Sequence, residues 1–443
     1  MRALSRWVGA FAGGLSLLFF TGGVAAEVPQ ARDFGVPGTN ASHWPRWLPE
    51  DPGRSDRTTP ATAASTPLTM AAGDSLRQRF STDAVVQKWA SGPASLPWIG
   101  LTLELIVKYQ QNPLRAARVL AHLHAAANDA IVQMAATSSA EATQAVAVHA
   151  ATSAVLAYFY PQELPGRLDA IGVGAMLAVA ARARVSPEKL AFAREVGRRA
   201  AAEAIRRALD DGSDATWNPA DRPAAAAPVW RAAPPLNLYN PSEPLAGNWR
   251  TWALEDSKEI SPPQPVPFGS ERYWNEAQEV LRVSRALTPE QKRIADEWNL
   301  DKGSVTPPGV WNRKAMELVA GRGWGTAETA RVLAALNVAL SDALIACWWA
   351  KFAHWTVRPV NVVREKLDPD FLPCLRRPSR VMFPGHAAAS GAAVGVLAAF
   401  FRSAPPSCKS GPRRRRCRAS TAGFIFAATT TKACGSAGRS DDE

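Results

Sequence analysis

Apolar residues recur every three or four positions over much of this chain, which is the spacing of helices that bury one face. No alternating pattern long enough for a useful strand interrupts them. The expected helices cover residues 114–136, 141–158, 187–209, 326–355 and 387–401. The pattern therefore predicts an all-α protein made of helical bundles.

Residues typical of helix starts support these positions. Asn112-Pro113 and Ser186-Pro187 each place a capping side chain before a proline at the first helical position. Thr288-Pro289-Glu290-Gln291 has the form of a capping box. Gly325 is expected to end the loop before the helix that begins at Thr326.

Stretches rich in proline divide the helical pattern. Residues 27–95 form a Pro/Ser/Thr-rich N-terminal extension, and residues 218–268 form a connection that is too polar and too often interrupted by proline for regular structure. We expect an N-terminal helical bundle over residues 96–217 and a second helical domain over residues 269–402.

The first 26 residues have the pattern of a secretory signal peptide. Arg2 and Arg6 precede an apolar run, and Val24-Ala25-Ala26 provides small residues for cleavage. An N-terminal membrane anchor is the alternative, although the run is short and contains several glycines. We expect a secreted or periplasmic protein without a stable membrane span after the signal is removed.

The net charge of +12 is unevenly placed, since residues 403–443 hold eight Lys or Arg against three acidic residues. The same tail carries three of the five cysteines, and Cys347 and Cys374 alone provide no disulfide framework. A basic arm that binds nucleic acid is one interpretation of this tail. We favour a different origin for the tail and expect no nucleic-acid partner.

His122, His124 and Asp129 have a spacing that can suggest metal ligands. On a helix, however, residues two apart point to different faces. We interpret both imidazoles as ordinary side chains of an Ala-rich helix, and Asp129 and Asp342 as polar contacts inside their bundles. No metal-ligating side chain is predicted.

Lys351 and Arg358 are the first candidate site residues. Lys351 follows an apolar run in which an unpaired cation would be costly, and Arg358 lies seven residues later. Pro359 disfavours helical geometry at Arg358, so we expect the chain to bend there. An ammonium group and a guanidinium group brought together in this way suit a phosphate-like oxyanion. A solvated helix face is the alternative interpretation of this pair.

Gly385 and His386 precede an apolar helix and form the second candidate segment. The free N–H groups at a helix N-terminus favour an anion, and glycine lets the backbone come close to it. His386 beside such an anion could act as a general acid or base. An incidental residue near a helix start is the alternative.

Together these segments resemble the signature of the vanadium haloperoxidase and acid phosphatase superfamily, which has the motifs K-x6-R-P, P-S-G-H and S-R-x5-H. Residues 351–359 match the first motif completely. Residues 383–386 match only the Gly-His end of the second, because Pro384 stands where the family has Ser and Phe383 where it has Pro. The resemblance runs from about residue 98 to residue 401 and is strongest to the bacterial haloperoxidase-like branch.

The resemblance implies an all-α enzyme that holds vanadate, or phosphate as an alternative ligand, among Lys351, Arg358 and Gly385. It places Trp348 near the cofactor and gives His386 the handling of protons. Hydrogen peroxide and halide would be the substrates of a haloperoxidase, and a phosphate ester that of a phosphomonoesterase. A non-catalytic binding protein is the third possibility. The halide, the organic substrate and the oligomeric state stay open.

The third motif is missing, because no histidine follows His386. In the family this motif supplies a second arginine and the histidine that is bonded to vanadium, or that serves as the nucleophile of the phosphatases. Read one base out of frame from near Cys408, with freely chosen wobble bases, the tail can encode Ser-Arg, five residues and then His. The concealed His arises from the codons of Phe424 and Ile425. We infer that residues 403–443 are a frameshift product, so that the second bundle is truncated and the chain is impaired.

Overall fold

The computed structural model describes residues 41, 44, 46–48, 88–138, 140–223, 229–232, 240–260, 264–371 and 385–401. The predicted signal peptide, most of the N-terminal extension, Phe383, Pro384 and the tail lie outside these residues. In the described part of the chain, the regular structure is helical, and the β-type pairing there is an isolated bridge between Val229 and Thr356. The prediction of an all-α protein is confirmed.

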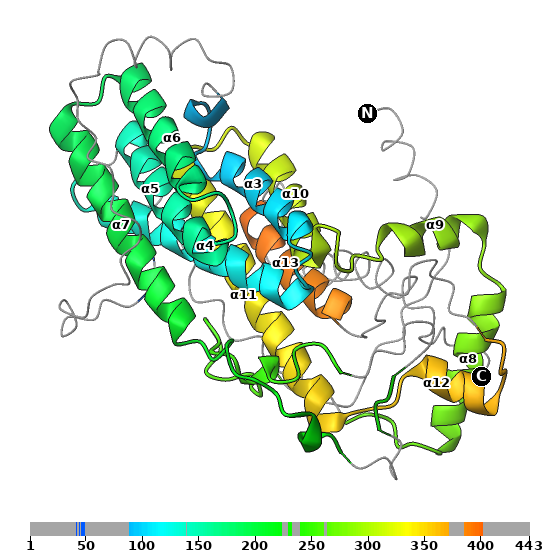
Figure 1. The fold of residues 1–443 in the computed structure, drawn as a ribbon. Helices are drawn as coiled ribbons and strands as arrows, with labels where there is room; N and C mark the ends of the chain where they lie inside the picture. The colour runs from blue at the N-terminus through cyan, green and yellow to red at the C-terminus, as the bar shows by residue number, and fades with distance from the viewer. Residues whose placement is uncertain are drawn as a thin grey trace, which may run out of the picture. The chain divides into compact units, whose positions relative to one another are not determined.

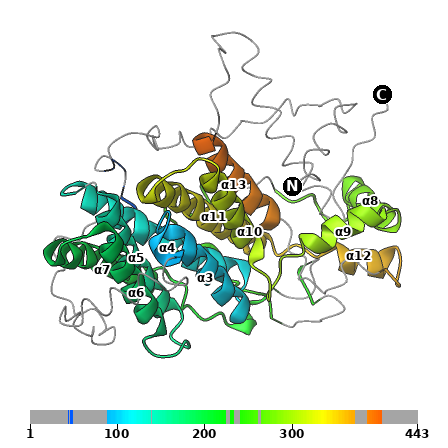
Figure 2. The ribbon, with the colours of Figure 1, turned by 90° about the horizontal axis from the view of Figure 1, so that it is seen from above.

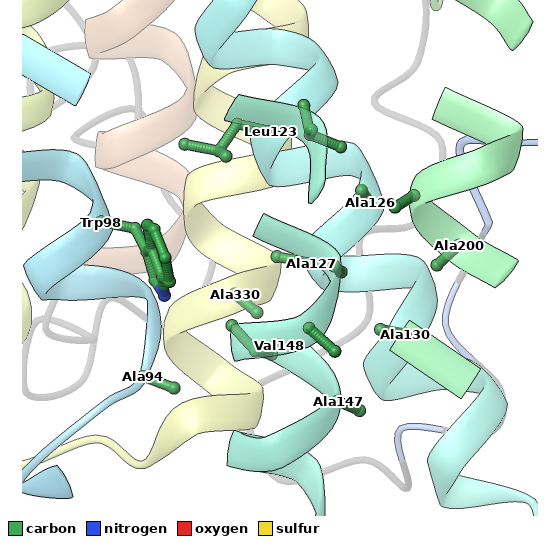
Figure 3. Packing of buried hydrophobic residues seen from close by; sticks show 14 of the residues in the cluster. Ala94, Trp98, Leu123, Ala126, Ala127, Ala130, Ala147, Val148, Ala200 and Ala330 are labelled. Carbon is green, nitrogen blue, oxygen red and sulfur yellow. The ribbon is translucent and has the colours of Figure 1, made fainter. Parts of the chain in front are cut away.

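Five helices form the first bundle, and Figure 1 shows α4, α5, α6 and α7 side by side. Their bounds are α3 (Ser95–Lys108), α4 (Pro113–Ala135), α5 (Glu141–Phe159), α6 (Arg167–Ala183) and α7 (Pro187–Leu209). Small side chains from α4, α5, α7 and α11 meet in the core near Trp98 and Leu123 (Figure 3). The frequent alanines therefore allow these helix axes to approach closely.

The helices that follow are α8 (Glu271–Arg285), α9 (Pro289–Glu297), α10 (Thr306–Ala320), α11 (Thr326–His354), α12 (Pro359–Lys366) and α13 (Gly385–Phe401). Two short 3-10 turns, η3 (Pro219–Asp221) and η4 (Ala246–Asn248), lie in the Pro-rich connection. α11 packs against α4 on one side and α13 on another (Figures 1 and 2).

The predicted helix starts are present. The Asn112 side chain accepts a hydrogen bond from the backbone N–H of Arg115, and both bonds of the capping box between Thr288 and Gln291 are formed. Two boundaries differ from expectation. α13 begins at Gly385 rather than Ala387, and α11 ends at His354, one residue before the predicted end.

α6 was not predicted, because Gly172 and Gly174 lower its helix propensity. Tertiary packing explains the first of these glycines. A Cβ at Gly172 would lie 2.4 Å from Oγ of Ser153, so the residue allows α6 to pack closely against α5. Packing against α5 therefore outweighs the local preference.

The three histidines of the first bundle, His122, His124 and His149, are core residues. Burial lowers the pKa of each to about 3, so the rings are neutral at physiological pH. Nδ1 of His149 accepts a hydrogen bond from the Trp98 indole at 2.9 Å. Among the described residues, no group of three or more potential ligands could hold a metal ion.

α5 and α11 are long and apolar enough to cross a membrane by length and composition alone. Most of each apolar window is buried inside the fold, 72% for α5 and 83% for α11. Core helices of this length pass the same test, and we interpret both as core helices.

Asp342 of α11 holds the end of the Pro-rich connection. Its carboxylate accepts hydrogen bonds from the backbone N–H groups of residues 252, 253 and 254 at 2.8, 2.7 and 3.1 Å. Arg115 of α4 lies 4.8 Å from the ring of Trp249 in the same segment. Residues 249–254 therefore join the two central helices.

The segment at residues 44–48 is also held between α4 and α11, but here the aspartate lies on α4 and the arginine on α11. Asp129 of α4 accepts hydrogen bonds from the backbone N–H groups of Trp47 and Leu48 at 3.0 and 2.9 Å. Arg331 of α11 lies 4.5 Å from the ring of Trp44. Both segments have the spacing Trp-x-x-Trp, and each is held by an aspartate of one central helix and an arginine of the other. This relation is not evident from the sequence pattern.

We expect Asp342→Ala to lower the free energy of unfolding by about 3 kcal/mol, since three N–H groups would lose a charged acceptor. Asp342→Asn keeps one oxygen acceptor and should lose about half as much. Urea denaturation of the two variants beside the unmodified chain checks this. Equal stability of all three proteins would contradict the role given to Asp342.

Candidate oxyanion site

Trp348 of α11 is the centre of the candidate site. Its indole N–H donates a hydrogen bond to the backbone carbonyl of Ser242 at 3.1 Å, which fixes the ring. The ammonium nitrogen of Lys351 lies 3.3 Å from the ring centroid. A Cβ at Gly385 would lie 3.2 Å from Cζ3 of the same ring. The indole therefore joins Lys351 to the N-terminus of α13.

The Lys351 amine is buried and has no hydrogen-bond acceptor among the described residues. Its pKa is lowered to about 8, mainly by burial; the Cys347 thiol acts in the opposite direction, and the positive charge of Arg358 adds to the lowering. A buried ammonium group with a π-face but no anion beside it is costly. The amine is thus prepared for an anionic partner.

The chain leaves its helical path between Lys351 and Arg358. Trp355 ends α11 in the left-handed conformation, at φ 46°, and Thr356 pairs with Val229. Arg358 is extended and precedes α12, which has Pro359 at its first position. The expected bend is therefore present, but its sharpest point is at Trp355. The positive charge of Arg358 contributes to lowering the pKa of Lys351.

Gly385 and His386 occupy the first turn of α13, whose leading N–H groups have no carbonyl partners within the helix. Gly385 is buried and His386 is half-buried. Only a residue without a Cβ fits against Trp348 at this position without a shift of the ring. The structure thus brings Lys351, Arg358, Trp348 and Gly385 into one region, with His386 next to Gly385 in sequence.

Sequence reasoning missed the aromatic residues beside this region. Trp217, Trp230, Phe352 and Trp355 form a cluster, and Arg358 lies 5.4 Å from the ring of Trp230. Trp230 lies in a connection that was expected to be irregular. The available signal was the tryptophan between the two cations, at position 355.

Comparisons with known proteins agree with this arrangement. The family model of the second helical-bundle domain of VCPO matches residues 331–371, which include Trp348, Lys351 and Arg358. The crystal structure of a bacterial vanadium-dependent iodoperoxidase is similar with a TM-score of 0.58 and 20% sequence identity, covering 69% of this chain and 80% of that one. The chain has the vanadium haloperoxidase fold.

An apo-type bacterial vanadium-dependent chloroperoxidase is a more distant neighbour of this fold. Its TM-score is 0.42 and its sequence identity 18%, with 57% of this chain and 64% of that chain covered. No curated protein matches the chain. The predicted resemblance to the vanadium haloperoxidase superfamily is confirmed at the level of the fold.

Proposed function

We propose that this chain derives from a haloperoxidase-type enzyme that holds vanadate, with hydrogen peroxide and halide as its small-molecule substrates. The observation that carries the proposal is the buried Lys351 amine, which lacks an acceptor among the described residues and contacts the same Trp348 ring that borders Gly385 at the start of α13. The iodo- and chloroperoxidases with similar structures support the proposal.

The residues present fit a tetrahedral oxyanion. Lys351 and Arg358 would hold it by charge, and the N–H of Gly385 would donate to it at the helix start. When bound, vanadate would supply the Lewis-acidic centre at which hydrogen peroxide becomes able to oxidise halide. Phosphate has the same shape and is the alternative ligand.

The protein's own groups carry the rest of the chemistry. The Lys351 charge is fixed in a region from which water is partly excluded, so it acts on an oxyanion more strongly than it would in solvent. His386 would hold or release a proton beside that anion. Trp348 fixes the position of the Lys351 amine.

We further propose that the chain as given is impaired. The arginine and histidine of the third motif are absent, and residues 403–443, which should supply them, lie outside the described structure. A comparison of α5 with α13 supports the proposal. α5 packs against α4, and its other faces are covered by α6 and α7. α13 packs against α11 as α5 packs against α4, yet it exposes a stripe of small residues, namely Ala387, Gly391, Gly395 and Ala399.

The frameshift proposal has a direct test. Resequencing the gene across codons 400–443 should reveal an added or missing base near codon 408, after which the frame encodes Ser-Arg, five residues and His. A confirmed reading frame, with the basic tail translated as given, would contradict it.

A phosphomonoesterase that uses the same pocket is the second candidate function, favoured by the suitability of the pocket for phosphate. A non-catalytic protein is the third, favoured by the missing histidine. Halide-dependent bromination of a dye and hydrolysis of a phosphate ester, each measured with and without vanadate, separate the three. For the proposed enzyme in the corrected frame, only vanadate-dependent bromination is expected. We also propose secretion or export to the periplasm, directed by residues 1–26.

Oxyanion binding should depend on pH through Lys351. The folded pKa of about 8 is below the ordinary value of 10.5, so the amine loses its charge as pH rises through 8. Affinity for phosphate should therefore fall by up to about tenfold per pH unit above pH 8, with little change from pH 6 to 7.5. Calorimetric titration over this range measures it. An affinity that stays constant to pH 9.5 would contradict the role of the amine.

The lowered pKa of Lys351 also makes the free energy of unfolding depend on pH. Because the unfolded chain keeps the Lys351 proton up to a pKa near 10.5, the cost of burying the charge is fully present below pH 8. The contribution of this residue to the free energy of unfolding should thus become more favourable between about pH 8 and 10.

A further inference from the structure

Four aromatic rings gather where the chain bends after α11. The ring of Trp355 lies 5.0 Å from Phe352, 6.2 Å from Trp217 and 6.4 Å from Trp230, measured between centroids. All four side chains are half-buried rather than part of the core. The cluster therefore presents aromatic surface that the fold itself does not cover.

The backbone at Trp355 is held in an unusual conformation. A φ of 46° is strained for a large side chain, and such outliers persist only where the surroundings fix them. The carbonyl of Trp355 accepts a hydrogen bond from the N–H of Trp230 at 2.6 Å, and its N–H donates to the carbonyl of Lys351 at 2.9 Å. Glycine would suit this turn better, so the indole is retained despite its backbone cost.

The segment that carries Trp230 is fixed to the region after α11 at further points. Val229 pairs with Thr356, the Asn361 side chain donates to the carbonyl of Ala232 at 2.9 Å, and Arg231 forms an ion pair with Glu365. These contacts order a part of the Pro-rich connection that has little core of its own. Their effect is to set the Trp230 ring beside Trp355.

Two guanidinium groups border the cluster. Arg222 lies 5.5 Å from the ring of Trp230 and 6.0 Å from that of Trp217, and Arg358 lies 5.4 Å from that of Trp230. Aromatic faces favour a planar ring, and guanidinium groups favour an anionic substituent. Arg358 also belongs to the candidate oxyanion site, so a ligand on this surface would lie next to that site.

We propose that Trp217, Trp230, Phe352 and Trp355 form a binding surface for a planar aromatic anion, such as an aromatic carboxylate or a phenolate. Its use as the organic substrate rests on the proposed function. In that role a hypohalous acid would transfer its halogen to the ring, and the displaced ring hydrogen would leave with the hydroxyl of the acid as water. Binding itself requires neither vanadate, peroxide nor halide.

The test measures binding of 2-naphthoate to the full chain by calorimetry, without vanadate, peroxide or halide. Cyclohexanecarboxylate is the aliphatic anion and 2-naphthamide the neutral aromatic compound for comparison. We expect saturable binding of 2-naphthoate that is at least about threefold tighter than that of either comparison compound. Equal binding of cyclohexanecarboxylate, or no saturable binding of 2-naphthoate, would overturn the proposal.

Trp355→Gly is the sharpest variant, because glycine accepts the positive φ and keeps both backbone hydrogen bonds. It should weaken 2-naphthoate binding about three- to tenfold while the melting temperature is maintained. Trp230→Leu should weaken binding in the same way and serves as a second, independent variant. The matched control is Trp324→Leu, which removes the half-buried ring stacked on Phe401 and should leave binding unchanged.

Unchanged binding in both cluster variants would overturn the assignment of the surface. Because all these measurements omit vanadate, their failure is distinct from failure of the proposed function. That function is tested by halide oxidation and vanadate binding, which do not depend on the aromatic probe.

Discussion

Replacing Lys351 with Met is expected to stabilise the ligand-free chain and to abolish its oxyanion binding. The amine is buried and has no acceptor in the part of the chain that the structure describes, and its pKa is lowered to about 8, so its charge is unfavourable for folding at neutral pH. Met fills a similar volume without this charge and can lie against the Trp348 ring. We expect a gain of about 1–3 kcal/mol in the free energy of unfolding.

Thermal denaturation at pH 7 measures the gain, which corresponds to a rise of about 2–5 °C in melting temperature. The matched control is Lys292→Met, because Lys292 is exposed on α9, and this variant should change the melting temperature by less than one degree or so. A destabilised Lys351→Met variant would show that the amine has a stabilising partner and is not kept for a ligand.

The second large effect is expected from restoring the reading frame of the tail. A chain that carries the alternative-frame peptide from near residue 408 would regain the arginine and histidine of the third motif and the helices that could cover α13. We expect vanadate-dependent bromination to rise from undetectable to measurable rates, because removal of such a group commonly costs about 10²- to 10⁴-fold in rate.

The restored chain should also melt at a higher temperature, since apolar surface on α13 would be buried. The control is the restored chain with the concealed histidine replaced by alanine. This variant should keep the added stability but lose the bromination activity. Bromination by the chain as given, at a rate comparable to that of the restored chain, would contradict both the frameshift proposal and the impairment.

Local signals accounted for much of the fold. The caps at Asn112, Ser186 and Thr288 begin helices where the sequence predicts them, because a side-chain oxygen that accepts a helix-start N–H acts within a few residues. The three-to-four spacing located α11 with similar success. α6 escaped prediction because Gly172 serves a contact with α5 that only the tertiary structure reveals.

Long-range contacts could not be predicted from sequence pattern. Asp129 and Asp342 were expected to make polar contacts within their bundles, but their partners lie 81 to 90 residues away in the chain. The Trp-x-x-Trp spacing at residues 44–47 and 249–252 fixes only two residues, which is too short a pattern to indicate a structural role by itself. It becomes informative once both aspartates are seen to bind the backbone of these segments.

In the candidate site, too, local motifs could be predicted from the sequence and long-range contacts could not. The first motif identified Lys351 and Arg358, and the helix-start pattern identified Gly385, because both are local features. The contact between Trp348 and Gly385 depends on how α13 packs against α11, and it explains why a Cβ at that position would press on the indole ring. The aromatic surface depends on Trp230, which is 125 residues before Trp355 in the chain and is set beside it by backbone pairing.

The central claim is that Lys351, Arg358 and the start of α13 form one oxyanion pocket, and calorimetric titration of the full chain with orthovanadate at pH 7 tests it most directly. We predict saturable binding that Lys351→Gln and Arg358→Gln each weaken at least about tenfold, while Lys292→Gln has no effect. Binding that is equally strong in all four proteins, or no binding to any of them, would contradict the claim.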